Sequence, residues 1–244
     1  MSPVLEVRNV TVRFGGHLAL DDVSIAAPPG EVTGLIGPNG AGKTTLFNVV
    51  TGLQAPARGS VRLDGEDVTG LAPYRRARRG LARTFQRLEL FGLLTVRENV
   101  ELAAAAGRRR SGRHSATRAD RALELVGLTG QAGVRADELP TGRARLVELA
   151  RALATGPQVL LLDEPASGQD ERETEAFREV LLSVAAAGIA VVLVEHDVHL
   201  VMRTCARVHV LDFGRVLASG TPAEIQADRA VLDAYLGAAP VVTA

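Results

Sequence analysis

One run of eight residues constrains the fold of this chain more than any other feature of its sequence. Gly37-Pro38-Asn39-Gly40-Ala41-Gly42-Lys43-Thr44 matches the phosphate-binding loop pattern. It follows a short apolar strand, Thr33 to Gly37, and leads into a helix over Gly42 to Val50 that Gly52 can end. The glycines let successive backbone N–H groups point at a phosphate, and the helix adds its positive dipole end. This order of strand, loop and helix predicts a nucleotide-binding α/β fold.

Two side chains of the loop point to a phosphorylated ligand and a metal ion. Lys43 is the single lysine among 28 basic residues, and its compact ammonium group suits the β and γ phosphates. A forked guanidinium cannot replace it inside the loop, although arginine stands at every other basic position. The Thr44 hydroxyl is expected to ligate Mg²⁺. The loop residues expected to contact the nucleotide are Gly37, Pro38, Asn39, Gly40, Ala41, Gly42, Lys43, Thr44 and Thr45.

Acidic and histidine side chains follow two later apolar strands. Val159 to Leu162 indicates a strand buried on both faces, and Asp163 and Glu164 stand at its carboxyl end, the edge where ligands of parallel sheets bind. We expect Asp163 to hold Mg²⁺ and Glu164 to orient or deprotonate an attacking water. His196 ends the next buried strand and is expected to reach the γ-phosphate. The alternatives are a helix cap formed by the two acids and a metal site shared with His199, near which no cysteine or third histidine stands.

The N-terminal part is expected to form strands that face a core. Two stretches, Leu5 to Val7 and Val10 to Phe14, alternate apolar and polar residues, which we interpret as two strands. Pro28-Pro29-Gly30 predicts a turn, and Gly59 to Gly70 is typical of a strand with turns.

The middle of the chain is expected to be helical. Thr95 and Glu98 have the spacing of a capping box at a helix start. Two more helices are predicted, one over Arg118 to Val126 and one after Gly142. Residues 88–157 therefore form a predicted helical block between two α/β halves.

The α/β pattern returns in the last third of the chain. A predicted helix over Glu171 to Ala187 connects the strand at Val159 to Leu162 with another over Ile189 to Val194. This βαβ unit implies a parallel sheet. A hairpin is expected over Val208 to Leu217, and Thr221 is expected to cap a terminal helix.

Composition excludes several classes of protein. The chain has 46% hydrophobic and 23% charged residues, which is typical of a soluble globular protein. Its net charge of zero argues against a protein that binds nucleic acid over its whole surface. No apolar run approaches the roughly 18 residues of a membrane span, and Met1 to Phe14 lacks the apolar stretch of a secretory signal. The single cysteine, Cys205, forms no internal disulfide. We therefore expect a cytoplasmic protein that meets a membrane only through a partner.

The balanced charge hides a basic segment. Residues 58–119 hold 14 basic and 6 acidic side chains, a net charge of +8. Most of this bias comes from the clusters Arg75-Arg76-Arg78-Arg79 and Arg108-Arg109-Arg110-Arg113. One interpretation is a solvated helix face followed by a disordered loop. A second is a basic face turned toward anionic lipid or a membrane partner; nucleic acid ranks third because no aromatic residues interleave to stack bases. We expect the clusters near the membrane.

Together, the order and spacing of the motifs resemble the ATP-binding cassette ATPases, the motor subunits of ABC transporters, over essentially the whole chain. Leu160-Leu161-Leu162-Asp163-Glu164-Pro165 is similar to the Walker B motif of this family, and Arg83-Thr84-Phe85-Gln86 to its Q-loop. Ser167-Gly168-Gln169-Asp170 resembles its D-loop, and Glu195-His196-Asp197 its H-loop. Phe14 stands where the family stacks an aromatic ring on adenine; the alternative is an ordinary core aromatic.

The resemblance implies an α/β fold with a P-loop NTPase (RecA-like) core, a mainly parallel sheet, an N-terminal antiparallel β part and an inserted α-helical subdomain. A single domain is expected, in which residues 1–87 and 158–244 form the catalytic core and residues 88–157 the helical signature subdomain. ATP and Mg²⁺ are the implied cofactors. The implied catalytic residues are Glu164, His196 and Gln86, and the implied Mg²⁺ ligands are Thr44, Gln86 and Asp163.

The signature sequence of the family, usually Leu-Ser-x-Gly-Gln, corresponds here to Leu139-Pro140-Thr141-Gly142-Arg143. In the family this segment contacts the γ-phosphate held by a second subunit, through the serine hydroxyl and backbone N–H groups at a helix start. Pro140 offers neither a hydroxyl nor an N–H, and Gln169 replaces the apolar residue usual before the D-loop aspartate. Our hypothesis is that this signature serves a weakened composite site, while the intact Walker motifs pair with the signature of a different subunit.

Several features resemble the branched-chain amino-acid importer type. They are Arg83-Thr84-Phe85-Gln86 followed by Leu90-Phe91, the helix start from Leu93 to Val100, and the ending Ala234-Tyr235-Leu236-Gly237. Such importers combine two different ATPase subunits, two membrane permease subunits and an external substrate-binding protein. The implied location is the inner face of the cell membrane. The cargo does not follow from an ATPase sequence.

The resemblance also implies a mechanism. ATP joins two cassettes face to face, Glu164 polarises water, His196 stabilises the γ-phosphate charge, and Gln86 signals to the helical block that seats a permease helix. Two alternatives remain: an ABC-type ATPase acting on nucleic acid or ribosomes, and a poorly hydrolytic regulatory subunit. The first usually carries two cassettes or a long coiled coil, and the second is favoured only by the altered signature.

Overall fold

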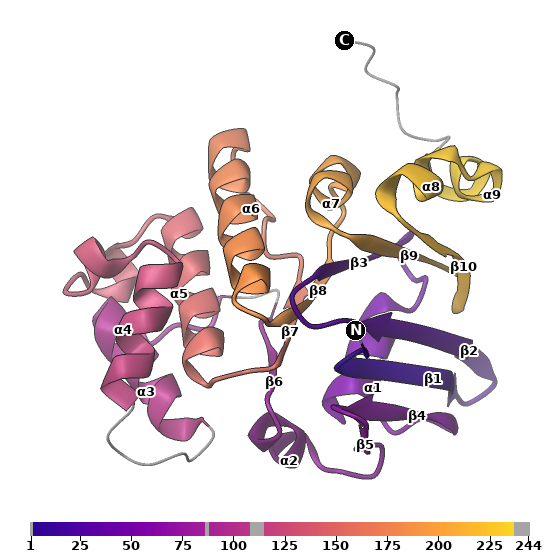
Figure 1. Ribbon diagram of the computed structural model, residues 1–244, viewed down its shortest axis with the longest axis horizontal. Helices are drawn as coiled ribbons and strands as arrows, with labels where there is room; N and C mark the ends of the chain where they lie inside the picture. Colours follow the sequence, from indigo (N-terminus) through magenta and orange to yellow (C-terminus); the bar gives the residue numbers. More distant parts are fainter. Residues whose placement is uncertain (1, 86–87, 108–114, 237–244) are drawn as a thin grey trace.

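The computed structural model describes residues 2–85, 88–107 and 115–236 of the chain. A group of three helices lies at one end of the molecule, a six-stranded sheet at its centre and a smaller antiparallel sheet at the other end (Figure 1). Within these ranges, no helix is both long enough and apolar enough to cross a membrane.

The central sheet carries the phosphate loop. Its strands are β3 (Val32–Ile36), β6 (Leu81–Arg83), β7 (Val159–Asp163), β8 (Ala190–Val194), β9 (Arg207–Asp212) and β10 (Arg215–Gly220). They are arranged in the order β10-β9-β3-β8-β7-β6, with β10 antiparallel to β9 and the other neighbours parallel. The predicted parallel βαβ unit and the late hairpin are thus confirmed.

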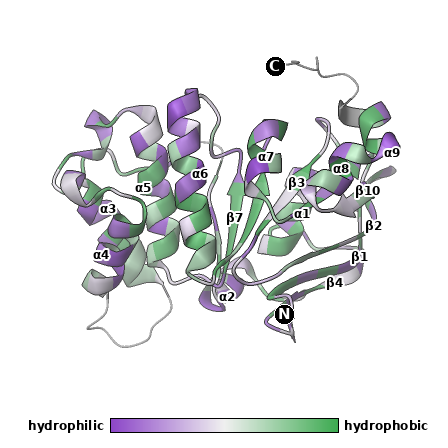
Figure 2. Cartoon of the chain, turned by 45° about the horizontal axis from the view of Figure 1, so that its top comes forward, coloured by the Kyte–Doolittle hydropathy of each residue, from purple (hydrophilic) through white to green (hydrophobic). Residues whose placement is uncertain are grey.

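The parallel strands are buried on both faces, as their continuous apolar runs predict. In β7, Leu160 and Leu162 join one hydrophobic core, whereas Leu161 joins the other. The second core lies between the two sheets and is filled by helix α1 (Lys43–Thr51), whose Phe47 is completely buried. Figure 2 shows the hydrophobic strand β7 enclosed by helices and sheet. The sheet therefore holds the phosphate loop on a rigid support.

The antiparallel sheet corrects the expectation for the N-terminal part. It contains β1 (Leu5–Phe14), β2 (His17–Ala27), β4 (Arg58–Leu63) and β5 (Glu66–Asp67), in the order β2-β1-β4-β5. Two strands were expected between Leu5 and Phe14, but the structure has the single strand β1. The chain forms a bulge within β1 and stays in the sheet. Asn9 has a left-handed backbone (φ 50°), and the pairing with β2 shifts between Val7 and Val10. β2 itself was not predicted.

The three-helix group consists of α3 (Val96–Ala106), α4 (Ser115–Leu125) and α5 (Thr141–Ala154), with the short 3₁₀ helices η1 (Thr129–Gln131) and η2 (Ala136–Glu138) between α4 and α5. The predicted capping box is confirmed: the Thr95 hydroxyl accepts from the Glu98 N–H, and the Glu98 carboxylate accepts from the Thr95 N–H. These helices share a core with β7 and β8. The limits of this unit at residues 88 and 157 stay a prediction.

A second set of helices follows β7. They are α6 (Glu171–Ala186), α7 (Val198–Thr204), α8 (Pro222–Ala227), α9 (Arg229–Val231) and the π-helical η3 (Leu232–Leu236). α6 and α7 pack on the face of the central sheet opposite α1 (Figure 1). The predicted cap of α8 by Thr221 is confirmed, whereas α7 was not predicted.

Helix α2 (Pro73–Arg78) also was not predicted, and it changes the interpretation of the first arginine cluster. Arg76 is only 1% exposed, and its guanidinium donates to the carbonyls of Val49 and Val50 at the end of α1 at 2.7 and 2.8 Å. It also donates to the carbonyls of Thr69 and Leu71. Arg76 is therefore an internal clamp, and its assignment to a solvated or membrane-facing surface is wrong. The second arginine cluster lies outside the described residues.

Candidate functional site

The phosphate loop closes tightly around its own lysine. Lys43 is 7% exposed, and its Nζ donates to the carbonyls of Gly37 at 2.7 Å and Pro38 at 3.0 Å. Burial lowers the Lys43 pKa, and the nearby carboxylates of Glu164 and Asp163 oppose this effect. The ammonium group is thus held inside the loop where its backbone donors converge.

Glycine is required at two places where the loop approaches other backbone. Gly37 has φ 150°, and a Cβ there would meet the Leu211 carbonyl oxygen at 2.0 Å. Gly42 has φ 109°, and a Cβ there would lie 2.8 Å from the Ala19 carbonyl oxygen. The glycines at the ends of the motif therefore seat the loop against β9 and β2.

A hollow of about 280 Å³ lies beside the loop, and sequence-predicted residues from four separate segments meet in it. They are Phe14, Asn39, Gly40, Gly42, Lys43, Thr44, Thr45, Glu164 and His196. Gly37, Pro38 and Ala41 shape the loop behind this surface without lining the hollow. Phe14 is 50% exposed, so the alternative of an ordinary core aromatic is wrong. His17, which pairs with Phe14 across the β1–β2 turn, also lines the hollow and was not predicted.

Glu164 and His196 face each other across the ends of β7 and β8. The Nε2 atom of His196 lies 2.6 Å from Oε1 of Glu164. Glu164 has a left-handed backbone with φ 50°, a strained conformation for a non-glycine residue and one that is frequent at functional sites. Glu164 therefore lines the hollow, whereas Asp163, the last residue of β7, does not, and His199 lines a separate hollow.

Asp163 lies deeper than Glu164, and its partner was missed by sequence reasoning. Its carboxylate accepts from Nη2 of Arg83 at 2.8 Å, while Nη1 of the same arginine donates to Asn48 at 2.7 Å. Asp163 is 8% exposed. The sequence marked Arg83 only as the first residue of the motif that resembles the Q-loop. It could not indicate the contact with Asp163, because the two residues are 80 positions apart.

A second missed residue is Glu195, which precedes the candidate histidine. It is buried and accepts from the N–H groups of Ala166 at 2.8 Å and His196 at 3.2 Å. Burial raises its pKa, and the two backbone hydrogen bonds oppose this shift. Glu195 thereby joins the end of β8 to the segment that follows Glu164.

The donor atoms at the site fit Mg²⁺. Thr44 lines the hollow with its hydroxyl, and Asp163, whose Oδ2 pairs with Arg83, supplies a carboxylate at the end of β7; both are hard oxygen ligands of the kind that Mg²⁺ prefers. Gln86, the third expected ligand, lies outside the described residues. Bound Mg²⁺ would neutralise charge on the β and γ phosphates.

The signature segment and the D-loop begin two helices outside this hollow. α5 starts at Thr141, and Pro140 occupies its N-cap position without a side-chain hydrogen bond. Asp170 caps α6, because its carboxylate accepts from the Glu173 N–H at 2.8 Å. A Cβ on Gly142 would meet the Glu173 carboxylate at 2.5 Å, so the two helix starts are in contact. Leu139 and Arg143 flank this contact in sequence, and none of the five signature residues lines the hollow.

Comparison with known proteins identifies the family. Residues 20–167 match the family model described as ABC transporter. The chain belongs to the ABC transporter family. Residues 215–240 of this ABC cassette also match the model described as branched-chain amino acid ATP-binding cassette transporter.

Relatives match the ABC cassette over nearly its full length. It is 40% identical to the high-affinity branched-chain amino acid transport ATP-binding protein BraF of Pseudomonas aeruginosa, over 97% of this chain and 99% of the relative. It is 38% identical to the corresponding protein LivG of Escherichia coli K12, with the same coverage. Identity to the lipopolysaccharide export system ATP-binding protein LptB of Haemophilus influenzae is 32%, over 96% of this chain and 97% of the relative.

Solved structures agree with this assignment. The ADP conformation of an ATP-binding cassette of an ABC transporter matches with a TM-score of 0.88 at 30% identity, covering 97% of this chain and all of the other. The protein cbiO1 of Clostridium perfringens, part of the cbiONQ transporter complex, matches with a TM-score of 0.85 at 27% identity, covering 96% and 94%. The ABC cassette therefore has the α/β, P-loop ATPase fold expected from its motifs.

Proposed function

We propose that this chain is the ATP-hydrolysing subunit of an importer of branched-chain or other hydrophobic amino acids. The observation that carries the proposal is the match to BraF over 97% of the chain, together with the branched-chain model at residues 215–240. BraF and LivG are transport ATP-binding proteins for branched-chain amino acids, whereas LptB belongs to lipopolysaccharide export. The greater identity to the first two favours amino-acid import.

ATP binding begins at the phosphate loop. The triphosphate replaces the carbonyls of Gly37 and Pro38 as the partner of Lys43, and the backbone N–H groups of the loop hold its oxygens. The half-exposed Phe14 stacks on adenine from the rim of the hollow. Thr44 and Asp163 would hold Mg²⁺, which would neutralise phosphate charge, and Gln86 is the third proposed ligand.

Hydrolysis depends on the pair at the ends of β7 and β8. Glu164 orients water for in-line attack on the γ-phosphate and accepts its proton. Nε2 of His196, 2.6 Å from Oε1 of Glu164, holds this carboxylate in place, and on ATP binding this N–H is redirected to the γ-phosphate oxygens as charge develops on them. Asp170 and the segment Leu139 to Arg143 face the nucleotide of a second cassette, so each site is completed across a dimer.

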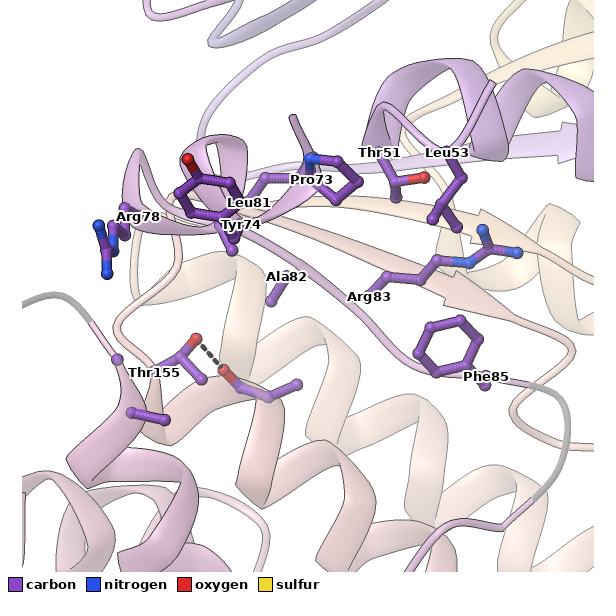
Figure 3. Close-up of a pocket in the computed structure, with 14 residues that line it drawn as sticks. Thr51, Leu53, Pro73, Tyr74, Arg78, Leu81, Ala82, Arg83, Phe85 and Thr155 are labelled. Atoms are coloured by element: carbon purple, nitrogen blue, oxygen red, sulfur yellow. Dashed lines mark hydrogen bonds between the residues drawn. The ribbon is translucent and has the colours of Figure 1, made fainter. Parts of the chain in front are cut away.

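A groove of about 530 Å³ is the surface on which we place the permease. It lies between the end of α1, α2 and β6 on one side and the ends of α3 and α5 on the other. Leu53, Tyr74 and Phe85 expose apolar surface there (Figure 3). The fitting occupant is an amphipathic helix of a permease subunit that sets apolar residues into the groove and acidic residues against Arg75 and Arg78, which lie over the Tyr74 ring.

The complete assembly contains further subunits. Two permease subunits cross the membrane, an external substrate-binding protein delivers the amino acid, and this cassette works on the cytoplasmic face. Its partner cassette is a different subunit, because the Pro140 position lacks the side chain that would cap α5 and reach a nucleotide in trans. Binding of nucleic acid is not part of this proposal.

The test is reconstitution. The chain is expressed together with candidate permease and second cassette subunits, the complex is purified, and ATP-dependent uptake of leucine, isoleucine and valine is measured in proteoliposomes with the binding protein. We expect uptake to require this chain. Failure of the permeases to co-purify, or co-purification of RNA or DNA instead, would contradict the proposal; a complex that transports without hydrolysis at this subunit would favour a regulatory role.

A further inference from the structure

Arg83 connects the apolar groove with the carboxylate that we assign to Mg²⁺. It is the last residue of β6 and lines the groove. At the other end of the side chain, Nη2 donates to Oδ2 of Asp163 at 2.8 Å, and Nη1 donates to Asn48 of α1 at 2.7 Å. One side chain therefore touches both the surface where a partner docks and the centre of the nucleotide site.

Two aromatic rings hold the guanidinium group of Arg83. Its central carbon lies 5.4 Å from the ring centre of Phe47 and 5.2 Å from that of Phe85. Phe47 is fixed in the core, whereas Phe85 is 48% exposed and lines the groove beside Arg83 (Figure 3). A ligand in the groove would meet Phe85, the exposed one of the two rings against which the guanidinium group rests.

The ion pair is shielded from water. The side chains of Arg83 and Asp163 are 8% and 11% exposed. In such surroundings the charge-assisted hydrogen bond from Nη2 of Arg83 to Oδ2 of Asp163 is strong, so the place of the guanidinium group restricts the place of this carboxylate oxygen.

The present arrangement leaves hydrogen-bonding capacity unused. Nε of Arg83 and the hydroxyl of Thr84 are buried and have no hydrogen-bond partner among the described residues. Buried polar atoms in native proteins are nearly always paired. These two donors therefore lie next to the Arg83–Asp163 pair without a protein partner in the described part of the chain.

We propose that Arg83 is a positioning residue that makes the orientation of Asp163 depend on what fills the groove. The inference rests on the proposed function, since it takes the occupant to be a permease helix. Docking shifts the Phe85 ring, the guanidinium group follows, and the carboxylate is brought into or out of the position in which it ligates the metal ion. The affinity of the site for metal ion is then coupled to the permease.

Metal affinity measures this coupling directly. Mn²⁺ binding in the presence of ATP is followed by the electron paramagnetic resonance signal of free Mn²⁺, in the Glu164→Gln background so that ATP is not consumed. The cassette alone is compared with the complete complex in lipid nanodiscs. With Arg83 present, we expect the two Mn²⁺ dissociation constants to differ by about fivefold or more.

Substitutions of Arg83 and Phe85 should reduce or remove the difference between the two Mn²⁺ dissociation constants. Arg83→Met is expected to give the same Mn²⁺ dissociation constant in both forms, and Arg83→Lys, which keeps the charge and loses the fork, to restore part of the difference. Phe85→Leu is a second variant whose half-exposed position spares the fold, and it should weaken the coupling while leaving the Arg83–Asp163 pair in place. The matched control is Arg97→Met, which breaks an exposed arginine–aspartate pair of 2.7 Å between α3 and α4 and should behave like the parent protein.

The outcomes separate the two proposals. If permeases bind and ATP is hydrolysed but Arg83→Met and Phe85→Leu keep the parental difference, the role of Arg83 is wrong and the proposed function stands. A parent protein without any difference, or an equal change of Mn²⁺ affinity in both forms of Arg83→Met, also overturns the inference, because the arginine would then be merely structural. If no permease binds at all, it is the proposed function that fails.

Discussion

At the scale of single residues, the site is built from side chains whose neighbours restrict them. Lys43 is held by two loop carbonyls, Asp163 by Arg83, and Glu164 by His196. Such restraint reduces the reorganisation needed when a nucleotide enters, because the charged groups already occupy defined positions.

Glu164→Gln should separate binding from hydrolysis. The amide keeps the shape of the side chain but cannot accept a proton, so we expect the hydrolysis rate to fall about a hundredfold or more while ATP affinity is retained. Size-exclusion chromatography with ATP should then reveal a trapped cassette dimer. Unchanged turnover would show that another group activates the water.

His209, buried in β9, should make stability depend on pH. Burial lowers its pKa from 6.5 to about 4, so it stays neutral in the folded protein while the unfolded chain protonates below about pH 6.5. Between these pKa values the unfolded state binds more protons, and stability is lost as the pH falls. From pH 7 to pH 5 the free energy of unfolding should decrease by about 2 kcal/mol through this group.

Urea unfolding at several pH values measures the effect of His209. His209→Leu should flatten the decrease between pH 7 and pH 5. If this variant keeps the slope of the parent protein, other titrating groups cause it.

At the scale of secondary structure elements, the sequence predicted long, strongly patterned segments well and short ones poorly. The apolar run of β7 and the capping boxes at Thr95 and Thr221 led to correct elements, because burial on both faces and helix capping act locally. Helices α2 and α7 have six and seven residues and were missed. Their stability comes from tertiary contacts that no local pattern contains.

The same limit applies to the candidate site. The phosphate loop, Glu164 and His196 follow from motifs, since each stands at a strand end or a loop that the pattern itself defines. Arg83 and Glu195 could not be assigned, because their partners are set by how strands align in the sheet. The expectation for Arg76 failed for a related reason: a charge cluster does not reveal which member turns inward.

Arg76→Met tests the clamp at the end of α1. The substitution leaves four carbonyl groups without their shared donor, so the free energy of unfolding should fall by about 3 kcal/mol. Denaturant titration gives this value. Arg75→Met, the same change on the exposed side of α2, is the control and should stay within about 0.5 kcal/mol of the parent protein. Equal effects of the two substitutions would mean that Arg76 is no clamp.

Pro140→Ser tests the start of α5. A serine hydroxyl can accept from the first turn of the helix, where no side-chain cap exists now, and should raise the free energy of unfolding by about 1 kcal/mol. In the same variant, ATP hydrolysis by the chain alone should increase, since the altered signature gains a hydroxyl. If the variant is more stable but hydrolyses ATP no faster, a signature residue other than Pro140 weakens the composite site.

At the scale of the whole molecule, the parallel sheet joins two surfaces with different tasks. Its strand ends carry the proposed nucleotide site, and the groove beside β6 opens between the core and the three-helix group. Movement of that group relative to the core would change the groove and the signature helix together, because α5 contributes to both.

The chain by itself should be a slow ATPase. In the purified cassette, only the altered signature of a second copy of the same chain can complete the nucleotide site. We therefore expect it to hydrolyse ATP at least about tenfold more slowly than the complex with a second, different cassette. A coupled-enzyme assay compares the two at equal site concentration. Full activity of the isolated chain would contradict the heterodimer proposal.

The buried lysine of the phosphate loop has a consequence for chemical labelling. Because Lys43 is the single lysine of the sequence, the chain carries one side-chain amino group, and this group lies in the nucleotide site. Burial lowers the pKa of this amine and also restricts the access of reagents to it. Apart from the terminal amino group, amine-directed reagents thus have one target in this protein, and the extent of reaction at Lys43 becomes a readout of whether the loop is filled.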